Sequence, residues 1–240
     1  TRVSMKLLNH FGVKKPLISY HEHNHVTAGQ SVLNRLLAGE SCALMTDAGT
    51  PAISDPGEDL VRLCAENGVE VRAIPGCCAA VNALAVSGLP TGRFTFEGFL
   101  TVNKKSRREH LNSLKGETRT MIFHEAPHKL RTTLNDLTEA FGPDRRISLC
   151  RELTKLHEEV LRFTLAEAVS YYEENAPKGE YVLVVAGAAP KTGAVVTLED
   201  GVAQVLALKE QGMRLKDAAK EVAEHTGLSK NELYAAALER

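Results

Sequence analysis

The sequence contains no tryptophan, and aromatic residues make up only 5% of its 240 residues. A platform of stacked aromatic rings, on which many proteins bind single-stranded nucleic acid, is therefore not expected. No apolar run approaches the roughly 20 residues that span a bilayer, so no transmembrane helix is predicted. The net charge is also close to zero, because 29 Lys and Arg residues are balanced by 30 Asp and Glu residues. This balance excludes a histone-like polycation but allows a local basic patch.

Cysteine chemistry has little support. The five cysteines form no CxxC pair, so no zinc or other metal site is predicted. Their number is odd, and Cys77 and Cys78 are adjacent, an arrangement that rarely bridges. We therefore expect reduced cysteines in a cytoplasmic protein.

Short apolar runs alternate with helical patterns along most of the chain. Runs that are apolar on both faces predict buried strands. Strands are predicted at Leu17–Tyr20, Cys42–Thr46, Val69–Ile74, Phe94–Phe99, Thr120–His124, Ile147–Cys150 and Val182–Ala186. Helices are predicted at about 28–38, 57–67 and 128–140, each followed closely by a glycine. The alternation predicts an α/β fold with mainly parallel sheets.

The order of these elements predicts three domains. Turn formers cluster at 87–92, so we expect an N-terminal α/β domain at 1–90 and a second α/β domain at 91–190. A linker is expected at 190–193, followed by a helical tail at 195–240.

The tail's helices are predicted to stop near Gly212 and Gly227, and Ser229–Glu232 matches a capping box. Two short helices with a glycine turn resemble a helix-turn-helix. Packing on the body or a partner is slightly favoured over nucleic-acid binding, because residues 199–240 hold six Lys and Arg against eight Asp and Glu.

Two loops have the composition of ligand-binding loops. Thr46–Gly57 follows an apolar run and holds two Pro, two Gly and two Asp, but it matches neither Gly-Lys-Ser/Thr nor GxGxxG. Ile74–Ala80 likewise leads from a predicted strand to a helix through small residues. Ligands of α/β sheets bind at such strand ends, and small residues allow close backbone approach. A tight structural turn is the alternative in both cases.

Polar clusters offer further candidates. Tyr20–His25 alternates His and Glu without the ligands of a closed metal site, which leaves a substrate-binding or acid–base role, or a solvated loop. His124–Lys129 and Arg151–Lys155 follow strands and suit either a site or an ion-pair network. Residues 101–131 hold eight Lys and Arg against three Glu. This stripe could neutralise RNA phosphates or be an exposed helix face.

Several of these motifs together resemble the tetrapyrrole (corrin/porphyrin) methylase superfamily, in particular its branch that methylates ribosomal RNA. The matching segments are 19–24, 47–57, 98–100, 151–155 and 179–183, and the resemblance covers essentially the whole chain. It implies two α/β domains with a cofactor cleft between them, a helix-turn-helix-like tail, and S-adenosylmethionine as cofactor. It also implies methylation of a cytidine 2′-hydroxyl in 16S ribosomal RNA of the small subunit, a homodimer and a bacterial cytoplasm.

The resemblance and the loop positions imply particular site residues. The cofactor-binding set is Ala48, Gly49, Thr50, Pro51, Ile53, Gly76, Cys78, Ala79, Leu153, Glu180 and Tyr181. A neutral ribose hydroxyl is a poor nucleophile, so a general base is expected among His21, His23, Glu125 and His128. RNA contacts are expected at Lys104, Lys105, Arg107, Arg108, Arg151 and Lys155.

The chain departs from the family pattern at three places. The family opens with a strand and a glycine loop before a segment whose end matches Thr1–Arg2, so that first cofactor loop is expected to be absent from this sequence. His124–Ala126 replaces Tyr-Glu-Ser, and Lys129 replaces an Arg that could hold phosphate in bidentate fashion. Two alternatives are methylation of a small tetrapyrrole on the same fold and a non-catalytic RNA-binding assembly module.

Overall fold

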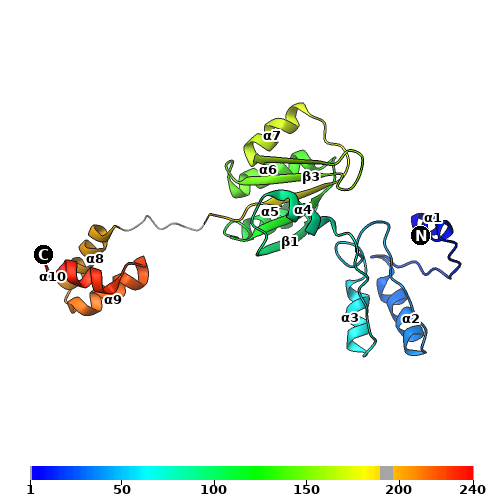
Figure 1. The fold of residues 1–240 in the computed structure, drawn as a ribbon, viewed down its shortest axis with the longest axis horizontal. Helices are drawn as coiled ribbons and strands as arrows, with labels where there is room; N and C mark the ends of the chain where they lie inside the picture. The colour runs from blue at the N-terminus through cyan, green and yellow to red at the C-terminus, as the bar shows by residue number, and fades with distance from the viewer. Residues whose placement is uncertain (1, 190–196, 240) are drawn as a thin grey trace. The chain divides into compact units, whose positions relative to one another are not determined.

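The computed structural model describes residues 2–189 and 197–239. It divides into two compact units, Thr1–Ala188 and Ala189–Arg240 (Figure 1). The linker predicted at 190–193 lies outside the described residues. The first unit contains α1 (Arg2–His10), α2 (His25–Leu37), α3 (Glu58–Glu66), α4 (Ala79–Ser87), β1 (Phe94–Phe99), α5 (Lys104–Ser113), β2 (Thr120–Glu125), α6 (Leu130–Phe141), β3 (Arg146–Arg151), β4 (Glu159–Thr164), α7 (Leu165–Glu174) and β5 (Tyr181–Val185).

Five strands form one sheet in the order β1-β2-β5-β3-β4. Only β1 and β2 pair in parallel, whereas β5 runs antiparallel to both β2 and β3, and β3 to β4. The prediction of mainly parallel sheets is therefore wrong. An apolar strand indicates that both faces of its sheet are buried, and helices do cover both faces here. Burial does not determine the direction of a strand, however, so the pattern cannot separate parallel from antiparallel pairing.

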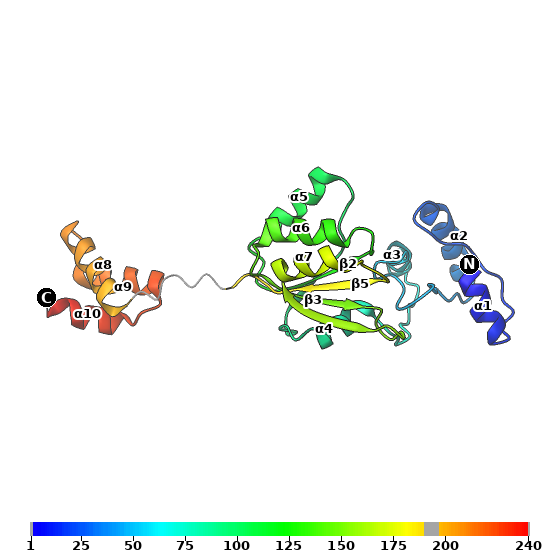
Figure 2. The same ribbon diagram turned by 90° about the horizontal axis from the view of Figure 1, so that it is seen from above.

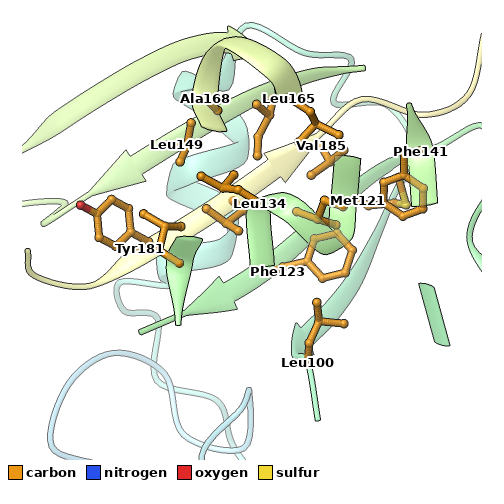
Figure 3. Close-up of a cluster of buried hydrophobic side chains, with 14 of the residues drawn as sticks. Leu100, Met121, Phe123, Leu134, Phe141, Leu149, Leu165, Ala168, Tyr181 and Val185 are labelled. Carbon is orange, nitrogen blue, oxygen red and sulfur yellow. The ribbon is translucent and has the colours of Figure 1, made fainter. Parts of the chain in front are cut away.

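The two faces of the sheet bury separate cores. One face packs on α6 and α7 through residues such as Phe123, Leu134 and Leu165, none of which is exposed (Figure 3). The other face packs on α4, where Ala83 and Leu84 meet Ile122 of β2 (Figure 2). Neighbouring residues of β2 therefore point to opposite cores, as the pleat requires.

Three predicted strands are absent. Leu17–Tyr20, Cys42–Thr46 and Val69–Ile74 are not strands, and their apolar side chains include the well-exposed Val71 and Ile74. A strand needs a hydrogen-bonded neighbour for its backbone N–H and C=O groups, and among the described residues none of these segments is paired with a strand. The four later predictions are confirmed as β1, β2, β3 and β5, while β4 was not predicted.

The three predicted helices are confirmed as α2, α3 and α6, with boundaries shifted by up to three residues. Gly39, Gly68 and Gly142 follow them with positive φ, the conformation that lets glycine end a helix. The expected break at 87–92 coincides with the end of α4 at left-handed Gly88. The assignment of residues on either side to two domains stays a prediction.

The second unit is a three-helix module of α8 (Leu198–Glu210), α9 (Leu215–Thr226) and α10 (Lys230–Leu238). Val205, Ala218 and Leu233 form its fully buried centre. The predicted ends near Gly212 and Gly227 are confirmed. The capping box predicted at Ser229 is wrong, because Ser229 caps α10 without a side-chain hydrogen bond, whereas Thr197 and Thr164 form capping boxes.

Candidate functional site

The two small-residue loops meet directly. Thr50 Oγ1 donates a hydrogen bond to the carbonyl oxygen of Cys77 at 3.0 Å, which joins the loop 46–57 to the loop 74–80. Gly49 packs against the same carbonyl, so closely that a Cβ there would lie 3.4 Å from it. Ala48, Gly49, Gly76 and Cys77 remain exposed. The pair of loops thus presents accessible backbone with little side-chain bulk, which suits close approach of a ligand.

Backbone strain gathers in the same region. Among the described residues, the four non-glycine residues with positive φ are Ala52, Ser54, Glu152 and Thr154. All lie in two loops that the sequence singled out, 46–57 and 151–155. Such conformations cost of order 1–3 kcal/mol each and cluster at functional sites.

His124 belongs to the polar cluster 124–129 but was not named among the predicted catalytic or binding residues. It connects the first loop to the end of β2. Its Nδ1 lies 3.3 Å from Ser54 Oγ, and its Nε2 is buried without a partner among the described residues. Phe96 and Phe99 both meet the His124 ring edge-on. A register shift at Gly98 makes this possible, because residues three apart on a regular strand point to opposite faces.

Burial lowers the pKa of His124 below its usual value, so the ring is neutral at pH 7. A neutral imidazole with one nitrogen unpartnered can accept or donate one more hydrogen bond. The signal in the sequence was the replacement of the family's tyrosine at this position.

The 151–155 loop is held by carboxylates. Glu152 Oε1 accepts from Lys155 Nζ and from the Glu180 backbone N–H, both at 2.9 Å, and Lys155 Nζ also lies 2.8 Å from Glu180 Oε2. Arg151 Nε lies 3.2 Å from Glu159 in an ion pair that lacks hydrogen-bond alignment. The predicted RNA contacts Arg151 and Lys155 therefore already have acidic partners.

Only some predicted cofactor contacts come together. Leu153 and Cys78 pack on the α4-side core, close to the joined loops. Tyr181 is 3% exposed in the core on the opposite face, where its hydroxyl accepts from the Lys178 backbone N–H, so its side chain is directed away from these loops.

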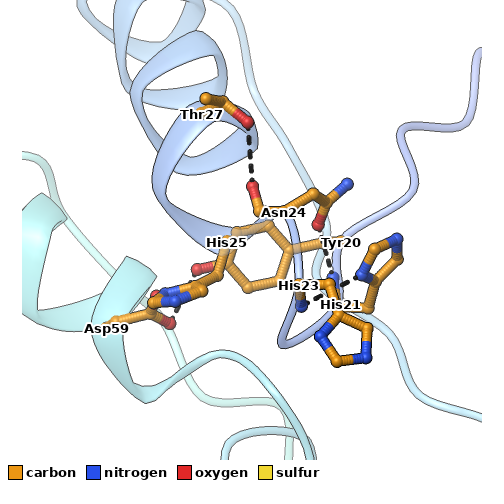
Figure 4. A network of polar contacts seen from close by, with 7 residues as sticks. All are labelled: Tyr20, His21, His23, Asn24, His25, Thr27 and Asp59. Atoms are coloured by element: carbon orange, nitrogen blue, oxygen red, sulfur yellow. Dashed lines mark hydrogen bonds and ion pairs between the residues drawn. The ribbon is translucent and has the colours of Figure 1, made fainter.

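The 20–25 segment is anchored to α3 by Asp59 (Figure 4). Tyr20 donates to Asp59 Oδ1 at 2.6 Å, and His25 pairs with the other carboxylate oxygen. A hollow of about 410 Å³, lined by residues that include His25 and Ser54, brings this segment beside the 46–57 loop. The side chains of His21 and His23 are exposed on the same segment, and their ring centroids lie 6.0 Å apart.

The Asp59 network predicts acid sensitivity. The hydrogen bond from Tyr20 is the main cause that lowers the pKa of Asp59 below 3.8, and His25 adds to it. A carboxyl whose folded-state pKa is lowered stabilises the fold above its unfolded pKa, and this contribution is lost as pH falls through the folded value. We expect Asp59→Asn to cost about 1 kcal/mol at pH 7, since its side chain is partly exposed.

Urea midpoints measured from pH 7 to pH 2.5 test this expectation, and the gap between wild type and Asp59→Asn should close below about pH 4. Asp144→Asn is the matched control, because Asp144 is exposed and forms no ion pair within the described residues. A gap that stayed constant with pH would contradict the network's role.

The basic stripe divides into paired and unpaired members. Arg107 is 9% exposed, and its Nε lies 2.5 Å from Asp136 Oδ2 while its Nη2 donates to Thr133. Thr133 in turn donates to Glu125, which is 4% exposed and also accepts from the Ala126 N–H. This buried chain leaves the predicted base Glu125 and the predicted RNA contact Arg107 with structural partners. Lys105 pairs with Glu109 at 4.0 Å, and His128 is exposed.

No described helix is long and apolar enough to cross a membrane. In the same part of the chain, no group of three or more His, Cys, Asp and Glu could hold a metal ion.

Comparison with known proteins identifies the family. The family described as Tetrapyrrole (Corrin/Porphyrin) Methylases matches residues 3–169, and the RsmI C-terminal HTH domain matches residues 196–240. Curated relatives named Ribosomal RNA small subunit methyltransferase I include one from Synechocystis, 46% identical over 100% of this chain and 86% of its own length. The relative from Escherichia coli O157:H7 is 41% identical, over 100% and 84%.

Solved structures show the same fold at low sequence identity. The methyltransferase CobJ aligns with a TM-score of 0.53 and 21% identity, over 75% of this chain and 78% of its own. Diphthine synthase aligns with a TM-score of 0.54 and 13% identity, over 76% and 73%. The predicted fold class and family are confirmed. The chain belongs to the tetrapyrrole (corrin/porphyrin) methylase family and, within it, to the family of ribosomal RNA small subunit methyltransferase I.

Proposed function

We propose that this chain transfers a methyl group from S-adenosylmethionine to the 2′-hydroxyl of a cytidine in 16S ribosomal RNA of the small subunit. The names of its full-length relatives support the reaction and the RNA substrate. The observation that carries the proposal is the convergence of the Thr50–Cys77 contact with the Ser54–His124 contact. These contacts gather two exposed small-residue loops and a half-satisfied polar side chain in one region.

The residues of this region fit the cofactor. The exposed backbone of Gly49 and Gly76 admits close approach, and Cys78 and Leu153 offer apolar surface nearby. When bound, the cofactor supplies the reactive methyl group and a sulfur leaving group. The chain's own task is to hold the acceptor hydroxyl in line and to receive its proton.

We assign the proton acceptor to the 20–25 segment. Glu125 is buried in a hydrogen-bonded chain, and His128 lies in a groove between α5 and α6 rather than at the joined loops. His21 Nδ1 accepts from the His23 backbone N–H, which places the His21 proton on Nε2 and makes that nitrogen a donor. His23 is therefore our choice for the base, and His21 for a hydrogen-bond donor to the substrate.

The loop junction gives a specific expectation for cofactor binding. Thr50→Val keeps the side chain's shape but removes the hydrogen bond to Cys77. Losing one such bond costs about 0.5–1.5 kcal/mol, so the dissociation constant for S-adenosylmethionine should rise about two- to twelvefold. Calorimetry measures it, with Thr27→Val as the control because Thr27 bonds only to Asn24 nearby. Equal affinities in the two variants would remove the junction from the cofactor site.

A methyl-transfer assay tests the function itself. The full chain is incubated with tritium-labelled S-adenosylmethionine and either unmethylated small ribosomal subunits or a porphyrinoid. Label should enter the RNA and appear in an alkali-resistant dinucleotide, because a 2′-O-methyl group blocks alkaline cleavage. Label in the porphyrinoid alone would favour tetrapyrrole methylation. Absence of both label and binding heat would favour an assembly module.

The oligomeric state and the cellular location belong to the same proposal. We propose that the enzyme acts as a homodimer and in the bacterial cytoplasm. Sedimentation of the purified chain at micromolar concentration should give twice the chain mass of 26.1 kDa, and a monomer that methylates at full rate would contradict the dimer.

A further inference from the structure

A groove of about 660 Å³ lies between α5 and α6. Its lining includes Lys104, Arg108, Lys115 and Lys129. We propose that this groove binds the phosphate backbone of RNA and thereby holds the substrate of the methylation site. The inference rests on the proposed function for the choice of RNA, and on the geometry of the groove for the binding surface.

Three of the four groove cations lie along or just after α5. Lys104 and Arg108 lie four residues apart on α5, which places them on one face of the helix, and Lys115 follows in the turn just after the helix ends. Asn103 fixes the start of this face, because its side chain accepts from the backbone N–H groups of Lys105 and Ser106. At about 1.5 Å per residue, α5 from Lys104 to Ser113 is about 15 Å long, and Lys115 lies just beyond its end. A line of charge of this length suits a polyanion better than one small anion.

The four cations that line the groove lack acidic partners. Within the described residues no ion pair involves Lys104, Arg108, Lys115 or Lys129, whereas Lys105 on the same helix pairs with Glu109. Like charges four residues apart on a helix destabilise it by a few tenths of a kcal/mol. Of the two acidic residues in the lining, Asp136 is engaged by Arg107, which leaves Glu139 to oppose four cations. Phosphates would supply the missing counter-charge.

The groove is held in shape by buried contacts. Arg107 of α5 reaches Asp136 and Thr133 of α6, and Thr133 donates to Glu125 at the end of β2. The preceding residue, His124, faces Ser54 on the opposite side of the sheet. The groove is therefore fixed to the same strand end as the candidate methylation site, so bound RNA would be positioned relative to it.

Salt-dependent RNA binding tests the inference. The full-length wild type is compared with Arg108→Gln/Lys115→Gln and with the control Arg93→Gln/Lys178→Gln, whose residues are exposed, unpaired within the described chain and outside the groove. Binding to a labelled 16S RNA fragment is measured between 0.05 and 0.3 M KCl. Losing two phosphate contacts should reduce the slope of log K against log salt by about 1.4–1.8, and affinity at 0.1 M by at least about tenfold. The control should match the wild type.

The outcomes separate this inference from the proposed function. If the wild type methylates RNA and the slope of log K against log salt is the same for the two double variants, the groove is not an RNA-binding surface and the proposed function stands. If only the groove variant shows a reduced slope and none of the proteins transfers a methyl group, the proposed function fails and the groove stands as an RNA-binding surface. Weakened binding of poly-glutamate with unchanged RNA binding would identify an acidic-peptide site and overturn the inference.

Discussion

Replacing Arg107 by alanine should lower the free energy of unfolding by about 3 kcal/mol. The Arg107 side chain is 11% exposed and forms an ion pair with Asp136 and a hydrogen bond to Thr133. Removing one member of a buried pair typically costs about 3–5 kcal/mol, because the partner keeps its charge without compensation. The Asp136 side chain is 32% exposed and can recover some hydration, so the lower end of that range applies.

Urea unfolding measures this cost, and Arg108→Ala is the matched control. Arg108 is the next residue on the helix and carries the same charge, but it is exposed and forms no ion pair within the described residues. Its substitution should change the free energy of unfolding by less than about 0.5 kcal/mol. If Arg107→Ala unfolded at the wild-type midpoint while losing RNA affinity, Arg107 would be an RNA contact as the sequence pattern predicted, and the buried pair would be unimportant.

Arg107 illustrates what the sequence could and could not predict at the basic stripe. The charge count between 101 and 131 correctly indicated an excess of cations on one region of the chain. Counting cannot separate a guanidinium that ties two helices together from one that faces solvent, because Asp136 lies 29 residues away in sequence. The partner becomes visible only when α5 and α6 pack.

The fold shows a similar limit. Apolar runs identified β1, β2, β3 and β5 because these strands are buried on both faces, but the same pattern at Val69–Ile74 did not produce a strand. Strand formation depends on a paired neighbour, which local composition does not report. β4 was missed because its alternating polar residues leave it only half buried at the sheet edge.

At the candidate site, composition identified the loops and missed their contacts. Pro, Gly and Asp at 46–57 correctly marked a loop with unusual backbone geometry, now seen as positive φ at Ala52 and Ser54. The pairing of Ser54 with His124 joins residues 70 positions apart. It was not predicted, because nothing in a single sequence relates two such distant positions.

His124→Phe should slow methyl transfer by about tenfold to a hundredfold while His124→Tyr keeps most of the wild-type rate. Phenylalanine preserves the ring that Phe96 and Phe99 contact but removes both nitrogens, so Ser54 and any ligand group near Nε2 lose a polar partner. An unpaired polar group in a buried site costs about 1–3 kcal/mol. Tyrosine, the residue that the family often has here, restores a polar atom to an aromatic ring.

The activity and pH profile of His124→Tyr distinguish this positioning role from a general-base role. The loss in His124→Phe should fall on kcat, with cofactor affinity by calorimetry unchanged within about twofold. The pKa of the His124 ring is lowered by burial, so protonation of this ring should reduce the wild-type rate only at a lower pH than an ordinary imidazole would. A phenol, with a pKa near 10, is a poor base at pH 7. Failure of His124→Tyr to retain activity, with an acid limb that disappears in that variant, would therefore make His124 the proton acceptor and displace His23 from that role.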